Sequence, residues 1–115
     1  MNIEEIVNIV DAEVVEGKGC HTKDIDQAFA SDLMSDVLTI DTGHTLMLVT
    51  GLANIQTIRT CEMAEIRIIL FVRGKKVTDE MKKLASENKM VLMETEYSLY
   101  KTSGLLFQAG IKPVY

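Results

Sequence analysis

The sequence predicts an α/β fold: a small layered sandwich in which a mostly parallel central sheet of about four to five strands is flanked by helices. Two apolar runs, Leu46–Val49 and Ile68–Val72, are too short to span a membrane and too apolar for surface strands. They fit buried parallel strands joined by a helix. The second half of the chain also alternates strand and helix three times, which predicts right-handed crossovers between parallel strands.

The N-terminal part is expected to add a helix and one or two strands. Asn2 can cap a helix over residues 3–10, whose apolar residues recur at helical spacing. Val14 and Val15 indicate a short strand before a turn at Gly17–Lys18–Gly19. Ile25–Ala30 is predicted as a further strand.

A helix over Asp32–Leu38 is expected next, capped by Ser31. Its inward residues would be Leu33, Met34, Val37 and Leu38. Asp41–Thr42–Gly43 is typical of a turn before the first buried strand.

The helices of the second half are identified by their caps and apolar faces. The crossover helix follows Gly51, Thr78 caps the next helix, and Thr95 or Ser98 begins a last helix that ends at Ala109. Met90–Met93 is a third buried strand, and Gly110 is placed as the residue after the last helix. The inward residues are expected to be Leu52, Ile55 and Ile58 in the crossover helix, Met81, Leu84 and Ala85 in the next, and Leu99, Leu105, Leu106 and Ala109 in the last.

Length and composition indicate one globular domain over residues 1–115, and the lack of signal-peptide and membrane-span patterns predicts that it acts in the cytoplasm. The net charge of −5 weighs against nucleic-acid binding, which depends on neutralising phosphates. The N-terminus carries acids where a signal peptide needs basic residues, and no run approaches the roughly 20 apolar residues of a membrane span. Two cysteines, Cys20 and Cys61, do not form a disulfide framework, so both are expected to be reduced.

The carboxyl ends of the predicted strands are where a parallel sheet binds ligands. Gly51 after one strand offers backbone N–H groups to an anion, and Arg73 and Lys75 add positive charge beside it. The expected ligand is a small anion such as a phosphate or carboxylate; the alternative is that Thr-Gly and Arg-Gly are ordinary turns. The candidate ligand-binding residues are Thr50, Gly51, Asn54, Arg59, Arg73, Gly74 and Lys75.

Arg59 is also three residues from Glu62 on the crossover helix. At that spacing the two form a surface ion pair or, alternatively, polar contacts for a partner.

No catalytic, cofactor or metal motif is present. Cys20, His21, His44 and Cys61 lack the spacing of a zinc site or of a Cys–His dyad. The acidic residues between 24 and 41 lack the order of a calcium loop and are expected to form a solvated rim: Asp24, Asp26, Asp32, Asp36 and Asp41. Gly17–Lys18–Gly19 is no phosphate-binding loop of the Walker type.

Several segments have an order and spacing typical of one family: Ala30–Leu38, the Thr50–Gly51 strand end, Ile58–Ala64, Ile69–Lys76 and the tail Glu94–Ala109. Together they resemble a DRTGG-domain protein. The family's name motif falls where this chain has residues 22–28, and Gln27 and Ala28 replace its paired glycines. The resemblance implies an accessory module that regulates or dimerises without catalysis, similar to the N-terminal domain of HPr kinase/phosphorylase.

Three hypotheses follow from these observations. The first is a non-enzymatic regulatory or interaction module that senses a small anionic, nucleotide-like ligand and forms a homodimer. The second is a purely structural module for dimerisation or for docking a protein partner. The third is an enzyme acting on a phosphorylated small molecule, with Arg73 and Lys75 as anion clamps and Glu62 or Glu94 as general base.

Overall fold

The computed structural model describes residues 1–19, 24–40 and 45–115. The helices are α1 (Ile3–Val10), α2 (Met34–Val37), α3 (Ile55–Met63), α4 (Asp79–Glu87) and α5 (Leu99–Gln108). The strands are β1 (Ala12–Glu16), β2 (Gln27–Ala30), β3 (Leu46–Thr50), β4 (Ile68–Phe71), β5 (Val91–Thr95) and β6 (Lys112–Pro113). The predicted turn at 41–43 lies outside the described residues.

The strands form one sheet in the order β1-β5-β4-β3-β2-β6. β1 runs antiparallel to β5, and the other neighbours are parallel. The mostly parallel α/β fold predicted from the sequence is therefore confirmed. The sheet has six described strands rather than four to five, because β6, which contains Pro113, adds a short edge beside β2.

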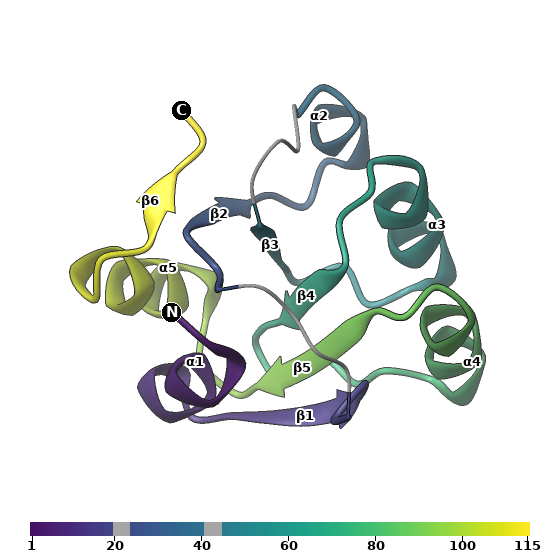
Figure 1. Ribbon diagram of the computed structural model, residues 1–115, viewed down its shortest axis with the longest axis horizontal. Coiled ribbons are helices and arrows are strands. Elements are labelled where there is room, and N and C mark those ends of the chain that lie inside the picture. Colours follow the sequence, from purple (N-terminus) through teal and green to yellow (C-terminus); the bar gives the residue numbers. More distant parts are fainter. Residues whose placement is uncertain (20–23, 41–44) are drawn as a thin grey trace.

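Helices cover both faces of the sheet (Figure 1). The helices α2, α3 and α4, which connect β2 to β5, pack on one face, while α1 and α5 contact each other and cover the other. Successive strand residues alternate between the two cores: Leu48 faces α3 and α4, whereas Met47 and Val49 face α1 and α5. Every residue of β3 and β4 is buried, as expected for central parallel strands.

Gln27 and Ala28, which the sequence resemblance sets against the family's paired glycines, lie inside a strand. Gln27 and Ala28 are the first residues of β2, and they pair with β3 on one side and with β6 on the other. Residues with side chains are compatible with this extended backbone, so no glycine is required there.

The expected helix over Asp32–Leu38 is wrong in length and in its inner face. The helix is the single turn α2, and its N-cap is Leu33 rather than Ser31; the Ser31 hydroxyl instead accepts a hydrogen bond from the Leu33 N–H. Met34 and Val37 are buried, but Leu33 is 57% exposed and Leu38 is 48% exposed. One turn is too short to bury a broad apolar stripe.

Three of the other helices begin at predicted caps, and smaller differences concern α3 and the end of α5. Asn2, Thr78 and Ser98 accept the expected backbone hydrogen bonds at the starts of α1, α4 and α5. The crossover helix α3 starts four residues after Gly51, at Ile55, and Ala109 is exposed rather than inward.

Thr102 on α5 carries the one buried side-chain hydroxyl that lacks a hydrogen-bond partner among the described residues. We expect Thr102→Val to raise the free energy of unfolding by about 1 kcal/mol, because it replaces an unsatisfied hydroxyl with a methyl group of similar shape. Chemical denaturation measures the change. Thr57→Val is the matched control and is expected to be destabilising, since the Thr57 hydroxyl donates to the Leu52 carbonyl at 2.7 Å. Equal effects of the two variants would contradict the prediction.

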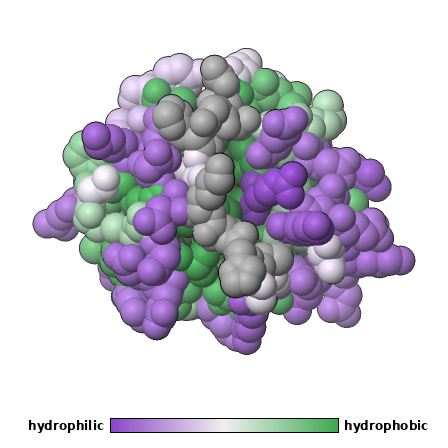
Figure 2. Space-filling model, viewed as in Figure 1, coloured by the Kyte–Doolittle hydropathy of each residue, from purple (hydrophilic) through white to green (hydrophobic). Residues whose placement is uncertain are grey.

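Hydrophilic side chains predominate on the face shown in Figure 2, most continuously at the right, where Figure 1 places α3 and α4. The exposed side of α4 carries charged residues such as Glu80, Lys83 and Glu87. Within the described ranges, no helix has the length and apolar character that a membrane crossing requires.

Candidate functional site

An aspartate from the loop after β2 is hydrogen-bonded to the end of β3. Asp32 Oδ1 accepts hydrogen bonds from the Thr50 hydroxyl and from the Gly51 N–H, both at 2.8 Å. Thr50 is fully buried, and its hydroxyl accepts a hydrogen bond from the Leu52 N–H at 3.1 Å. The strand end predicted to receive an external anion therefore already holds an internal carboxylate.

The turn after β4 has an uncommon backbone. Arg73 and Gly74 both have positive φ, +59° and +70°, and the Lys75 N–H donates to the Val72 carbonyl at 3.3 Å. Two central residues with positive φ are the pattern of a type I′ turn, which favours Gly, Asn or Asp rather than Arg.

Arg73 differs in its place from the other non-glycine residues with positive φ. Within the described ranges these are Asp11, Glu65 and Lys89, and each lies at or just after the end of a helix. A left-handed residue is common there, whereas Arg73 follows a strand. Unusual backbone of this kind is concentrated at functional sites.

Backbone hydrogen bonds connect this turn to the loop after β5. The Arg73 N–H donates to the Tyr97 carbonyl at 2.7 Å, and the Gly74 N–H donates to the Thr95 carbonyl at 3.0 Å. The chain leaves β4 toward α4 on one face and leaves β5 toward α5 on the other. The two strands therefore form a topological switch point, where α/β sheets bind ligands.

A cavity of about 320 Å³ lies at this edge, next to the switch point. Its lining comes from the ends of three neighbouring strands and the start of α5, and consists of Asp32, Gly51, Val72, Arg73, Lys75 and Leu99. Arg73 and Lys75 are exposed, and neither forms an ion pair among the described residues. The cavity thus combines two cations, one carboxylate and two apolar side chains.

The structure brings only part of the predicted ligand set together. Gly51, Arg73 and Lys75 line the cavity, and Thr50 lies directly behind Asp32. Asn54 instead caps α3, where its Oδ1 accepts hydrogen bonds from the N–H and the hydroxyl of Thr57. Gly74 and Arg59 do not line the cavity: Arg59 is exposed on α3, and a Cβ at Gly74 would meet the Glu96 carboxylate.

The carboxylates considered as general bases also lie outside this cavity. Glu62 is exposed on α3. Glu94 accepts a hydrogen bond from the Val77 N–H at 2.7 Å and lies 3.5 Å from the Lys76 ammonium. The carboxylate that does lie beside Arg73 and Lys75 is Asp32.

Sequence reasoning missed Asp32, which was expected only as part of a solvated acidic rim. The available signal was its place: Ser31 and Asp32 directly follow a strand that pairs with β3 in parallel, so Asp32 lies at the same sheet edge as Gly51.

Cys61 is a free, fully buried thiol, and burial raises its pKa from 9.0 to about 12. It therefore stays protonated and lacks the thiolate character of a nucleophile. Among the described residues, no three His, Cys, Asp or Glu side chains could jointly hold a metal ion.

The buried thiol predicts a stability change at high pH. Because the folded-state pKa is the higher one, the unfolded chain loses the Cys61 proton first, and stability falls as pH rises above 9. We expect up to about 1.4 kcal/mol lost per pH unit between pH 9 and 12. Denaturation of wild type and Cys61→Ala across this range isolates the effect, and parallel pH curves would contradict it.

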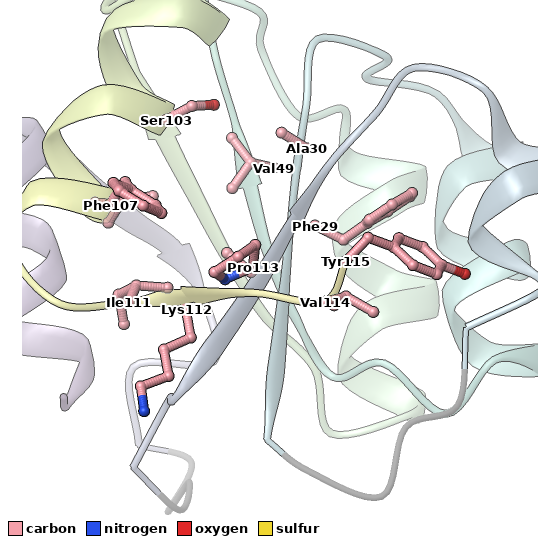
Figure 3. Close-up of a pocket in the computed structure, with 12 residues that line it drawn as sticks. Phe29, Ala30, Val49, Ser103, Phe107, Ile111, Lys112, Pro113, Val114 and Tyr115 are labelled. Carbon is pink, nitrogen blue, oxygen red and sulfur yellow. The ribbon is translucent and has the colours of Figure 1, made fainter.

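A second hollow, of about 280 Å³, lies between α5, β2 and the C-terminal segment (Figure 3). Its lining is mostly apolar and includes Phe29, Val49, Phe107 and Ile111. Phe107 is 69% exposed at its rim, and Tyr115 contacts the Phe29 ring edge-on with centroids 6.1 Å apart. The first cavity differs from this hollow in that its lining includes a carboxylate, that of Asp32, together with two cationic residues.

Comparison with solved structures finds a similar fold. The chain resembles a crystal structure of the CBS and DRTGG domains of the regulatory region of Clostridium perfringens pyrophosphatase, complexed with its activator, diadenosine tetraphosphate. The TM-score is 0.69 at 14% identity, and the match covers 96% of this chain but 47% of the pyrophosphatase chain.

This similarity supports the DRTGG-like fold that the sequence resemblance predicted. No protein-family model matches the chain, and no curated protein matches it. The similarity to the N-terminal domain of HPr kinase/phosphorylase stays a prediction.

Proposed function

We propose that this chain is a non-enzymatic regulatory module of the cytoplasm that binds a small phosphorylated ligand at the carboxyl edge of its sheet. The observation that carries the proposal is the cavity at residues 32, 51, 72, 73, 75 and 99, with two cations free of ion pairs among the described residues. The fold supports it, since the similar pyrophosphatase region is regulatory and was crystallised with a nucleotide activator.

The backbone of Arg73 adds independent support. A left-handed conformation costs an L-residue roughly 1–2 kcal/mol, so an arginine in the turn needs an offsetting role. Binding a phosphate at this cavity would provide that role, because guanidinium forms paired hydrogen bonds with phosphate oxygens.

Binding assays with Arg73→Ala test the site. Ribose 5-phosphate, AMP and diadenosine tetraphosphate are screened by thermal shift, and affinities are measured by calorimetry. For a probe that binds, we expect Arg73→Ala to weaken affinity about tenfold to a hundredfold, since a charged hydrogen bond contributes roughly 1.5–3 kcal/mol. Alanine has no more freedom at positive φ than arginine, so the fold is expected to be retained.

Two control variants make this experiment specific. Lys83→Ala removes an exposed cation from α4, and Arg59→Ala removes the predicted cation that lies outside the cavity. Both are expected to leave affinity unchanged. No binding by any probe, or equal binding by wild type and Arg73→Ala, would overturn the proposal.

The apolar hollow supports a second candidate, a homodimerisation or partner-docking role. Phe107 and Tyr115 are large and exposed beside it, an arrangement found at interfaces. Light scattering at micromolar concentration tests dimerisation, and a strictly monomeric wild type would contradict it. A dimer abolished by Phe107→Ser but retained in Arg73→Ala would separate this role from ligand binding.

A further inference from the structure

We infer that Asp32 divides the cavity into a cationic end and an acceptor end, so that its ligand is a phosphate ester bearing a hydroxyl group rather than a free inorganic anion. This inference rests on the proposed function and specifies its ligand class. The groups at this sheet edge that are already hydrogen-bonded limit where an anion can bind.

The N–H group of Gly51 is not available to a phosphate. It donates to Asp32 Oδ1 at 2.8 Å, so a phosphate placed there would meet a carboxylate instead of a free donor. Like charges at hydrogen-bonding distance repel strongly. The anionic part of a ligand is therefore directed to the side of the cavity formed by Arg73 and Lys75.

The carboxylate of Asp32, which lines the cavity, still has accepting capacity. The hydrogen bonds that it accepts from Thr50 and Gly51 both reach Oδ1, and no described residue donates to Oδ2. An ionised carboxylate offers about four acceptor positions in all. A ligand group beside Asp32 is therefore favoured when it donates a hydrogen bond, as a hydroxyl does.

Asp32 is also held in place before any ligand arrives. The Thr50 hydroxyl that binds it is fully buried and is itself fixed by the Leu52 N–H at 3.1 Å. An acceptor positioned in this way favours ligands that donate a hydrogen bond to it, because it loses little conformational freedom when such a ligand binds.

The remaining walls fit the carbon skeleton of an ester. Val72 and Leu99 place apolar surface in the same cavity as the charged groups. A volume of about 320 Å³ lies at the lower end of the roughly 300–1,000 Å³ typical of small-molecule pockets. A sugar phosphate, or the ribose phosphate part of a nucleotide, combines the three required chemistries.

Calorimetry with Asp32→Asn tests the inference, using ribose 5-phosphate and inorganic phosphate as probes. Asparagine keeps an oxygen to accept from Thr50 and Gly51 but has no negative charge and no second acceptor oxygen. We expect wild type to bind ribose 5-phosphate at least tenfold more tightly than inorganic phosphate. In Asp32→Asn the ratio is expected to fall at least tenfold, partly through tighter binding of inorganic phosphate.

Asp36→Asn is the matched control, since it makes the same charge change at an exposed residue of α2 that does not line the cavity. It is expected to preserve the wild-type ratio. Methyl phosphate, which has no alcohol hydroxyl group, gives a second measurement on wild-type protein alone. It is expected to bind at least tenfold more weakly than ribose 5-phosphate.

The outcomes separate this inference from the proposed function. Equal affinities of wild type for ribose 5-phosphate, methyl phosphate and inorganic phosphate would overturn the role of Asp32, while binding that depends on Arg73 would keep the proposed function. An unchanged ratio in a folded Asp32→Asn variant would also overturn the role of Asp32. No binding by any of the three probes or by a nucleotide would overturn both.

Discussion

Gly17→Ala is expected to lower the free energy of unfolding by about 3 kcal/mol or more, a large fraction of the roughly 5–15 kcal/mol that stabilises a domain. Gly17 follows β1 with φ of +87°. A Cβ at this position would lie 2.5 Å from the Met90 carbonyl oxygen and 3.0 Å from the Val91 Cα. Both are backbone atoms at the start of β5, so they cannot move aside as a flexible side chain could.

The alanine would therefore separate β1 from β5 at one end of their antiparallel pairing. That pairing already contains an irregularity between Val14 and Glu16. Urea denaturation followed by circular dichroism measures the loss. An effect below about 0.5 kcal/mol would be typical of an unconstrained surface position and would contradict the prediction.

Gly104→Ala provides the matched control on the same substitution. Gly104 is exposed within α5, and a Cβ there would meet no heavy atom within 4 Å. Alanine is the better helix former by about 0.8–1 kcal/mol, so this variant is expected to be more stable than wild type. Opposite signs of the change in unfolding free energy for Gly17→Ala and Gly104→Ala would show that the local backbone contacts and φ decide the effect of removing a glycine.

Much of the fold could be predicted because the hydrophobic pattern is strong. The runs that became β3 and β4 are short and apolar at successive positions, as strands buried on both faces require. The caps Asn2, Thr78 and Ser98 could also be predicted, since each is a short polar residue before an apolar helix face.

The short elements α2 and β6 contain too few residues for the hydrophobic pattern to predict them correctly. α2 has four residues, fewer than are needed to distinguish an inward face, so Leu33 and Leu38 were wrongly placed in the core. β6 has two residues and includes the chain's only proline, and its pairing depends on where α5 returns the chain. That return is a tertiary property that no local sequence window contains.

The candidate site could be predicted in its cations but not in its geometry. Arg73 and Lys75 were identified because they follow a strand that ends at the ligand-binding edge. Asp32 was missed because its partners, Thr50 and Gly51, lie 18 and 19 residues away in the chain. The left-handed turn was also missed, since an Arg-Gly pair indicates a turn without specifying the sign of φ at arginine.

Arg73→Gly is expected to separate stability from binding by changing them in opposite directions. Glycine adopts positive φ without the steric cost that arginine has. This gain in stability is offset in part because glycine has greater conformational freedom in the unfolded chain. We expect the free energy of unfolding to rise by about 0.5–1 kcal/mol. Affinity for a phosphorylated ligand is expected to fall at least tenfold, because the guanidinium group is lost from the cavity.

Lys89→Gly is the control that separates relief of a positive φ from loss of a cation in the cavity. Lys89 is also a cation with positive φ, +55°, but it follows the end of α4 and does not line the cavity. Its replacement is expected to give a similar gain in stability with unchanged affinity. If Arg73→Gly is less stable than wild type, the turn does not hold arginine at a conformational cost. If Arg73→Gly binds ligand as well as wild type does, the arginine at positive φ is not needed for ligand binding. If both variants gain stability but only Arg73→Gly loses binding, Arg73 is a residue kept for function against the preference of its own backbone.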